Sequence, residues 1–355
     1  MRNFTMTHKL AAAAVAVILV GVAGCNSGGS ENVQLSGAGS TFVYPVMTRW
    51  IQDFSKVHTN VQINYQSIGS GGGIQQVKSG TVDFGASDAA LSDQQLGEMK
   101  PVIQIPESAG PVCITYNLPD LNQPLQLSPE ALAGIFLGNI KTWQDSVIAK
   151  DNPGVKFPNQ PVVVAHRAEG SGTTNIFTTY LAAISPEWQA KVGKGNSVSW
   201  PVGIGGKGSE GVTGQIRQSP GAIGYVELTY AEQNHLPVAK IKNQAGQYIA
   251  ATAAATTAAI NAFSGQLSQD PRLPIVNPPA SAADAYPISG LTFLIIPKDG
   301  PGKAKRTALK NFVQYIITDG QATAGSLNYA PLPDGVKQYN QQQLQQLTAD
   351  GQPLQ

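Results

Sequence analysis

The chain has 355 residues and a formal net charge of +1, with 23 basic and 22 acidic side chains that make up 13% of the sequence. This balance excludes the strongly basic surface that binding to nucleic acid or to an anionic membrane requires. The length predicts two domains, and the 38 glycines and 24 prolines suit an α/β protein with many tight connections. Any affinity for an anion must then come from backbone N–H and hydroxyl groups.

The N-terminus is predicted to carry the signal peptide of a lipoprotein over residues 1–24. Arg2 and Lys9 form a short positive segment, and the apolar run that follows is too short to span a bilayer comfortably. The run ends in small residues directly before Cys25, which resembles a lipobox and predicts that Cys25 is lipidated and becomes the mature N-terminus. An ordinary signal peptide with an incidental cysteine is the alternative.

A flexible tether is expected over residues 25–33, and no later stretch is apolar enough to cross a membrane. The mature chain is therefore predicted to be a monomeric, periplasmic or otherwise extracytoplasmic body that meets a membrane only through its N-terminal lipid. The remaining cysteine, Cys113, lies in an apolar segment and is expected to be a buried small hydrophobe rather than a nucleophile.

Strands and helices alternate along the mature chain in the pattern of an α/β protein. The segments predicted as strands are 33–36, 61–65, 82–88, 102–106, 112–116, 162–167, 222–226 and 291–296. The segments predicted as helices are 42–54, 74–77, the stretch opened by a capping box at 92–95, 129–137, 176–184, 211–218, 250–263 and 303–317. Residues 203–208 are expected to form a loop before the helix at 211.

Three segments rich in glycine, serine and threonine stand directly before helices, at 37–42, 69–73 and 167–174. A glycine-rich turn that opens a helix presents free backbone N–H groups at the positive end of the helix dipole. In a parallel sheet such turns follow the carboxyl ends of the strands, where ligands bind. Side chains add further donors, namely Ser40, Thr41, Ser70, Ser171, Thr173 and Arg167. The turns therefore predict a pocket for a small oxyanion held mainly by neutral donors.

Asp88 stands at the end of one predicted strand and adds a negative charge. A carboxylate beside an anion is repulsive unless the anion carries a proton that it can donate. Phosphate at neutral pH keeps at least one proton and sulfate keeps none, so Asp88 disfavours sulfate. Glu169 is a candidate for a second acceptor of this kind. Each feature also has a simpler interpretation: glycines at positive φ, hydroxyls as helix caps, Asp88 in an ordinary turn and Arg167 in a surface ion pair.

The motifs give little support to an enzymatic role. The segment 170–172 lacks the G-x-S-x-G spacing of a nucleophile elbow, and residues 206–209 lack the spacing of a Walker A loop. The histidines show no spacing typical of a metal site or a catalytic triad, and His166 beside Arg167 is expected to be structural or at the rim of the site. The sequence therefore predicts neither an enzyme nor a metal or cofactor.

The ordered motifs resemble those of the phosphate-binding proteins of bacterial phosphate ABC importers, the PstS family. The resemblance covers about residues 35–333 and rests on GAGSTF at 37–42, IGSGGG at 68–73, VDFGASD at 82–88, RAEGSGT at 167–173, WPVGIGGKG at 200–208 and PGAIGYVE at 220–227. It implies high-affinity binding of inorganic phosphate and its delivery to the membrane permease subunits of an ABC importer.

The resemblance also implies an α/β fold of the type II periplasmic-binding-protein class. In this fold two domains, each a sheet flanked by helices, are joined by crossing hinge strands, and the ligand cleft lies between the domains. Mapped onto this chain, the first domain comprises residues 34–108 plus 286–350 and the second comprises residues 109–285.

The phosphate ligands of the family map onto matching positions of this chain. They are the Thr41 hydroxyl, the Phe42 backbone N–H, Ser70, Asp88 as proton acceptor, Arg167, Ser171, Gly172 and Thr173. Some members have Asp where this chain has Glu169, which leaves the contact of Glu169 with the ligand or with Arg167 open. Some members have Ala at the position of Ser40, so Ser40 is not among the expected ligands.

Two related roles remain open at this stage. One is a binding protein for another tetrahedral oxyanion such as sulfate or molybdate, against which Asp88 argues. The other is a lipoprotein that scavenges or signals phosphate without serving a transporter.

Overall fold

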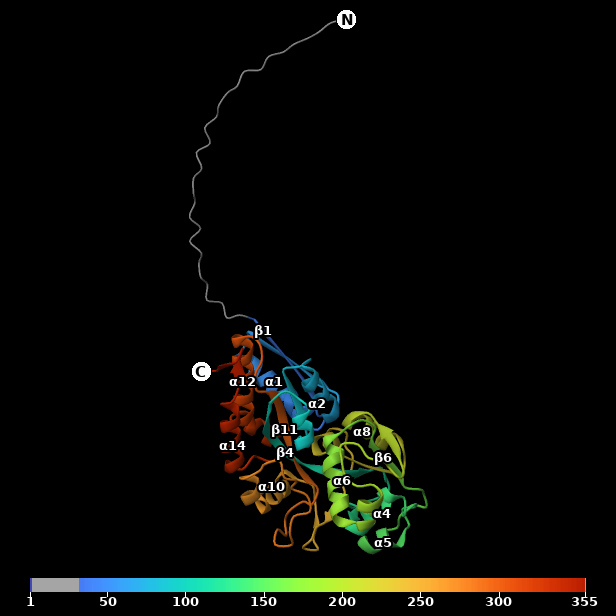
Figure 1. Cartoon of the computed structure of the whole chain (residues 1–355). Coiled ribbons are helices and arrows are strands. Elements are labelled where there is room, and N and C mark those ends of the chain that lie inside the picture. The colour runs from blue at the N-terminus through green and yellow to red at the C-terminus, as the bar shows by residue number, and fades with distance from the viewer. Residues whose placement is uncertain (2–31, 355) are drawn as a thin grey trace. The chain divides into compact units, whose positions relative to one another are not determined.

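The computed structural model describes Met1 and residues 32–354, and residues from 32 onward form one body (Figure 1). The predicted signal peptide, the predicted lipidation site Cys25 and the tether up to residue 31 lie outside the described residues. Val33, at the end of the predicted tether, already belongs to the first strand.

The strands are β1 (Val33–Gly39), β2 (Val61–Ser67), β3 (Phe84–Ser87), β4 (Val102–Tyr116), β5 (Gln126–Leu127), β6 (Val163–Arg167), β7 (Ile204–Gly206), β8 (Ala222–Glu227), β9 (Lys240–Lys242), β10 (Tyr248–Ile249), β11 (Ser289–Pro297), β12 (Thr348–Ala349) and β13 (Gln352–Pro353). The helices are α1 (Tyr44–Val57), α2 (Ser70–Ser79), α3 (Asp93–Gly97), α4 (Pro129–Leu137), α5 (Ser146–Asp151), α6 (Gly172–Ile184), α7 (Pro186–Lys191), α8 (Gly208–Gln218), α9 (Leu228–Gln233), α10 (Ala253–Ala262), α11 (Ser264–Leu267), α12 (Lys303–Ile317), α13 (Gly320–Ser326) and α14 (Asp334–Leu344).

One eight-stranded sheet, in the order β2-β1-β3-β11-β4-β8-β6-β7, runs through the body. β1 pairs in parallel with β2 and β3, and β6 pairs in parallel with β7 and β8, as the alternation of strands and helices predicts. β11 and β4 are antiparallel to their neighbours. The sheet therefore consists of two parallel sets of strands joined through an antiparallel pair.

β4 belongs to both halves of the sheet. Its residues 102–111 pair with β11, and its residues 112–116 pair with β8. The prediction of two separate strands at 102–106 and 112–116 is therefore wrong. The residues between them are typical of a turn, but they are buried and their backbone pairs with β11 at 289–292.

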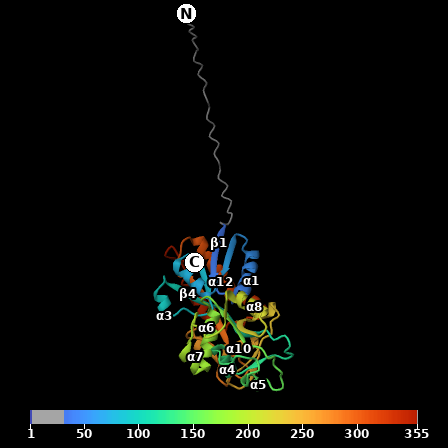
Figure 2. The ribbon, with the colours of Figure 1, turned by 90° about the vertical axis from the view of Figure 1, so that its right-hand side faces the viewer.

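Helices cover the two halves separately (Figure 1, Figure 2). α1, α2 and α12 contact the strands β1 and β2, whereas α6 and α8 contact β6 and β8. Each half has its own aromatic packing, with Phe54 against Phe312 at a ring-centroid distance of 5.2 Å in the first and Phe177 against Tyr225 at 4.6 Å in the second. These observations confirm the predicted α/β class, with sheets flanked by helices.

One local prediction needs correction. The segment 203–208 is not only a loop, because Ile204–Gly206 forms β7 beside β6 and α8 already begins at Gly208. β7 depends on its pairing with β6, which a local sequence pattern does not contain. The N-cap of α1 is Val43, whose backbone N–H donates to the Ser40 hydroxyl at 3.4 Å.

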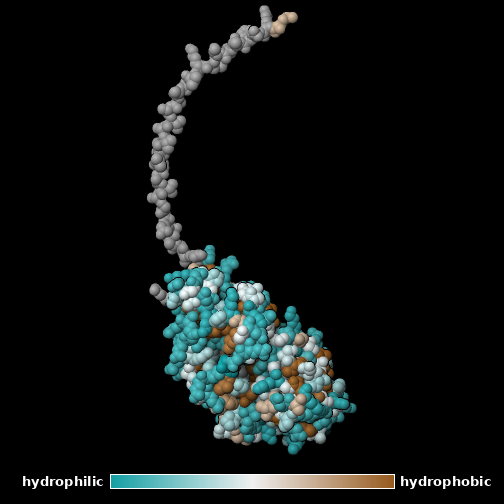
Figure 3. Space-filling model, viewed as in Figure 1, coloured by the Kyte–Doolittle hydropathy of each residue, from teal (hydrophilic) through white to brown (hydrophobic). Residues whose placement is uncertain are grey.

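The face of the body seen in Figure 3 is mostly hydrophilic, and its hydrophobic side chains lie in small patches. The large hydrophobic residues exposed on the described body are Tyr44, Val57, Val202, Ile204 and Leu273. Across residues 32–354, no helix combines the length and the apolar character needed to cross a membrane.

We expect Gly73→Ala to destabilise the fold, because α2 packs directly on the backbone of β1 at this glycine. A Cβ at Gly73 lies 2.5 Å from both the Ala38 carbonyl oxygen and the Gly39 Cα. Both atoms belong to the backbone of β1, which cannot shift without disturbing the sheet. Overpacking of this kind costs about 1–3 kcal/mol, which a lower melting temperature in circular dichroism measures. The matched control is Gly214→Ala in α8, where a Cβ meets nothing within 4 Å. It is expected to be neutral or to stabilise by up to about 1 kcal/mol, and equal losses in both variants contradict this account.

Candidate anion-binding site

The three glycine-rich turns meet at one place, where the two halves of the body touch. The Gly71 N–H donates to the Gly170 carbonyl at 2.9 Å, which joins the second turn to the third. Gly172 lies against Asp88 so closely that a Cβ there is 2.6 Å from the Asp88 nitrogen. A side chain at Gly172 does not fit this approach, and the two contacts bring the predicted donors of both halves around Asp88.

Asp88 follows β3 and is 3% exposed. Its Oδ1 accepts the Ser40 hydroxyl, and its Oδ2 accepts the Thr173 hydroxyl at 3.0 Å. Burial raises the pKa of Asp88 above its ordinary value, and the hydrogen bonds from Ser40 and Thr173 and the charge of Arg167 lower this pKa in part. Each carboxylate oxygen has two lone pairs, so Asp88 can still accept a hydrogen bond from a further donor.

Arg167 ends β6 and is 4% exposed. Its Nη1 donates to the Thr173 hydroxyl at 3.3 Å, and its Nε donates to Glu169 Oε1 at 2.8 Å. Nη2 also pairs with the Glu169 carboxylate, which in turn accepts the Gly208 N–H at 3.2 Å. The contact between Glu169 and Arg167, left open by the sequence, is therefore present, and it holds the guanidinium in one orientation.

Helices of both halves begin at the site. Ser70 is the first residue of α2, and its hydroxyl accepts the Asp88 N–H at 3.3 Å. Gly172 is the first residue of α6, which Ser171 caps by accepting the Thr174 N–H at 3.2 Å. The two converging helix N-termini make the site electropositive without adding a formal charge.

The first turn is bonded to the start of α8. The Thr41 and Ser209 hydroxyls are 2.9 Å apart, and the Ser209 N–H donates to the Thr41 hydroxyl at 3.2 Å. The Phe42 N–H, an expected ligand, donates to the Ser40 hydroxyl at 3.0 Å in this structure. The expected site residues therefore lie together, but several of them bond to one another.

Sequence reasoning missed some members of this cluster. Ser40 was left out of the expected ligands, yet it donates to Asp88. No motif marks Ser209 as a site residue, because only the tertiary fold brings α8 against the first turn. The Tyr225 hydroxyl accepts the Arg167 backbone N–H at 3.2 Å and lies 2.6 Å from the Thr174 hydroxyl. Of these residues, only Ser40 could have been recognised from the sequence, because it belongs to the first glycine-rich turn.

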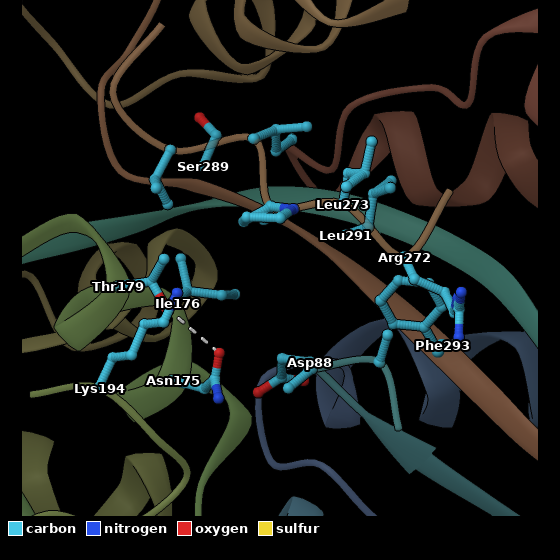
Figure 4. Close-up of a pocket in the computed structure, with 16 residues that line it drawn as sticks. Asp88, Asn175, Ile176, Thr179, Lys194, Arg272, Leu273, Ser289, Leu291 and Phe293 are labelled. Atoms are coloured by element: carbon cyan, nitrogen blue, oxygen red, sulfur yellow. Dashed lines mark hydrogen bonds between the residues drawn. The ribbon is translucent and has the colours of Figure 1, made fainter. Parts of the chain in front are cut away.

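A pocket of about 300 Å³ lies beside Asp88, with apolar side chains such as Leu291 and Phe293 in its wall (Figure 4). Lys194 and Arg272 add two positive charges, and Arg272 is already paired with carboxylates at 2.9 and 3.0 Å. Of the expected ligands in the described part of the chain, Asp88 alone lines this pocket. The pocket is therefore a neighbour of the three-turn site rather than the site itself.

Cys113 is fully buried in β4, as predicted. Burial raises the pKa of its thiol well above the ordinary value, which is the opposite of what a nucleophile needs. Within residues 32–354, His, Cys, Asp and Glu form no cluster of three or more that could hold a metal ion.

A family model and several known proteins match most of the chain. The family model for the PBP superfamily domain matches residues 26–320. The chain is 42% identical over 305 residues to the phosphate-binding protein PstS of Xylella fastidiosa, a match that covers 86% of this chain and 83% of that protein. It is 39% identical over 310 residues to the phosphate-binding protein PstS of Pasteurella multocida, with 87% and 89% covered.

A solved phosphate-binding protein from Stenotrophomonas maltophilia has a similar fold, with a TM-score of 0.63 at 16% identity over 86% of this chain and 92% of that one. At this sequence identity, the structural similarity is evidence for the fold alone. Together with the family match it confirms the predicted two-domain periplasmic-binding-protein fold.

We expect Ser40→Ala to raise the pKa of Asp88 further, because a donor to the charged form is lost. The measurement is the pH titration of the Asp88 carboxyl carbon by NMR. Ser87→Ala is the control, since Ser87 is adjacent in the chain but its hydroxyl bonds to Ala89. An unchanged titration in Ser40→Ala contradicts the assigned contact.

Proposed function

The chain belongs to the PstS family of phosphate-binding proteins, and we propose that it binds inorganic phosphate with high affinity and delivers it to the permease of an ABC-type importer. The observation that carries the proposal is the buried carboxyl of Asp88, which faces a cluster of neutral donors and the single guanidinium of Arg167. The proposal includes no catalysis: the site binds and releases an unchanged anion.

The proposed ligand set consists of the residues that surround Asp88 at the three turns. They are Thr41, Phe42, Ser70, Asp88, Arg167, Ser171, Gly172 and Thr173, with Glu169 acting through Arg167. Phosphate oxygens accept from the hydroxyls, from the helix N-termini and from the guanidinium. The contacts that Thr41 and Phe42 now make with protein oxygens are of the kind that they exchange for phosphate oxygens.

The phosphate proton is proposed to go to Asp88. A phosphate that keeps a P–OH group donates it to a free lone pair of the Asp88 carboxylate, whereas sulfate presents only acceptors. Carboxylate and sulfate oxygens then face each other without a proton, at a site too buried for water to screen them. Asp88 therefore supports phosphate and rejects sulfate while it is ionised.

Two further parts of the proposal concern the chain as a whole. The domain boundaries are proposed at 34–108 plus 286–350 and at 109–285, and support comes from β4, which passes from one half of the sheet to the other between residues 111 and 112. The protein is proposed to be a monomer outside the cytoplasm, tethered through a lipid on Cys25 and in contact with the permease subunits.

The first test is a calorimetric titration of the soluble body, stripped of co-purified anion, with phosphate and separately with sulfate. We expect a phosphate Kd of about micromolar or tighter at neutral pH and no sulfate heat. Asp88→Asn is expected to weaken phosphate binding about 10- to 100-fold, because a charge-assisted hydrogen bond is lost, and to admit sulfate. Folded, stripped protein that binds neither anion refutes the proposal.

The same titration has a pH dependence with a defined sign. The pKa of Asp88 is raised by burial, so the carboxyl takes up a proton as the pH falls through this raised value. Protonated Asp88 is a donor, and sulfate binding is therefore expected to appear at acidic pH in the parent protein and to be independent of pH in Asp88→Asn.

Lipidation is tested separately from ligand binding. We expect the full chain to sediment with membranes and to incorporate a labelled fatty acid in its native host, and Cys25→Ser to do neither. Cys113→Ser is the control, because Cys113 is buried in β4 and is expected to leave membrane attachment unchanged. Equal labelling of the parent and Cys25→Ser contradicts the lipobox interpretation.

A further inference from the structure

Glu107 occupies an irregular position in β4, the strand that both halves share. On β11, Thr292 pairs with Ser108 and the next residue, Phe293, pairs with Pro106. Glu107 therefore has no partner across the ladder and is the extra residue of a β-bulge. Bulges redirect side chains and are common beside functional sites.

The Glu107 side chain is completely buried, and neither carboxyl oxygen has a hydrogen-bond partner among the described residues. The hydroxyl of Thr292, which lies beside it, donates to the Ser108 carbonyl at 3.3 Å. The Thr292 hydroxyl lowers the pKa of Glu107 in part, but a buried carboxylate with no paired positive charge remains costly. These surroundings therefore favour the neutral carboxylic acid over the carboxylate.

The bulge lies close to the anion site. Pro106 on β4, Phe293 on β11 and Ser87 on β3 form one row across the sheet, and Asp88 directly follows Ser87. Adjacent strands are about 4.8 Å apart, so Glu107 starts from a position about 10 Å from the Asp88 backbone. Burial, and after it the negative charge of Asp88, raise the pKa of Glu107 well above its ordinary value.

The groups around the two carboxyls differ in kind. Asp88 accepts the Ser40 and Thr173 hydroxyls and feels the charge of Arg167. Glu107 interacts electrostatically with Asp88, which follows β3, and with Tyr65 of β2, and Thr292 of β11 lies beside it. None of these groups brings a positive charge. The Tyr65 hydroxyl already donates to the Ser40 carbonyl at 2.8 Å.

Environments that differ in this way divide the charge and the proton of a carboxyl pair between its members. In this pair the hydrogen bonds and Arg167 favour the negative charge on Asp88, which leaves the proton on Glu107. We infer that Glu107 is a positioning residue of the anion site: as a neutral acid behind Asp88 it keeps a second negative charge away from the bound anion, and its ionisation sets the alkaline limit of binding.

The direction of the effect follows from the charge. Glu107 is neutral below its raised pKa and becomes negative as the pH rises through it. The new charge repels both ionised Asp88 and the anion, so the affinity falls. Glu107→Gln keeps the shape and the neutrality and cannot ionise, so this variant lacks that fall.

The test titrates phosphate into the full chain and into Glu107→Gln from about pH 6 to pH 10; it rests on the proposed function. We expect the two Kd values to agree within about twofold near neutrality and their ratio to grow by up to about tenfold per pH unit in the alkaline range, as one titrating group allows. Glu107→Leu, a second neutral variant, is expected to show the same alkaline behaviour as Gln. Parallel curves for parent and variants over the whole range overturn the inference, as does a large loss in Glu107→Gln at neutral pH.

A second readout does not require any ligand. The infrared difference spectrum between the parent and Glu107→Gln is expected to contain the C=O band of a protonated carboxylic acid at neutral pH, and this band is expected to fade at alkaline pH. Asp88→Asn and the exposed control Glu98→Gln are expected to retain the band. A carboxylate band for Glu107 at neutral pH overturns the inference, whereas a parent that shows the acid band but binds no phosphate refutes the proposed function instead.

Discussion

The constraint on which the site depends is a carboxylate placed inside the protein without a cationic partner of its own. Asp88 is buried between the two halves of the body, and isolation there would force it to take up a proton. The hydroxyls of Ser40 and Thr173 offset part of this cost, and they come from different halves of the sheet. Bringing these donors to Asp88 therefore requires the halves to meet, so the electrostatics of one side chain are tied to the geometry of the whole fold.

The close approach of the halves depends on residues with no side chain. Gly71 and Gly170 join the second and third turns, Gly172 lies against Asp88, and a Cβ on Gly172 or Gly71 meets backbone within about 3 Å. The same glycines leave the N-termini of α2 and α6 open at their ends. The glycines of these turns therefore contribute both to the contact between the halves and to the open helix N-termini.

The sequence predicted which residues lie together at the candidate site, but not how they hydrogen-bond to one another. The three turns, Asp88 and Arg167 were found because short motifs carry them, and most helices and strands followed from apolar spacing. The continuity of β4 and the strand β7 were missed, since buried backbone pairing overrides residues that locally favour turns. The contacts of Ser209 with Thr41 and the burial of Glu107 join segments far apart in the chain, and no local pattern records them.

The distribution of charge bears on release as well as on binding. Glu169 pairs with Arg167, so the one guanidinium of the site is largely balanced before any anion arrives. In the proposed site, an anion is held by backbone dipoles and hydroxyls, whose strength depends on distance and direction rather than on long-range attraction. Because Thr173 and Gly172 come from one half and Ser70 and Thr41 from the other, a small separation of the halves removes much of the donor set at once. A donor set divided in this way would bind an anion when the halves are in contact and release it when they separate, which fits the proposed delivery of an anion to a permease.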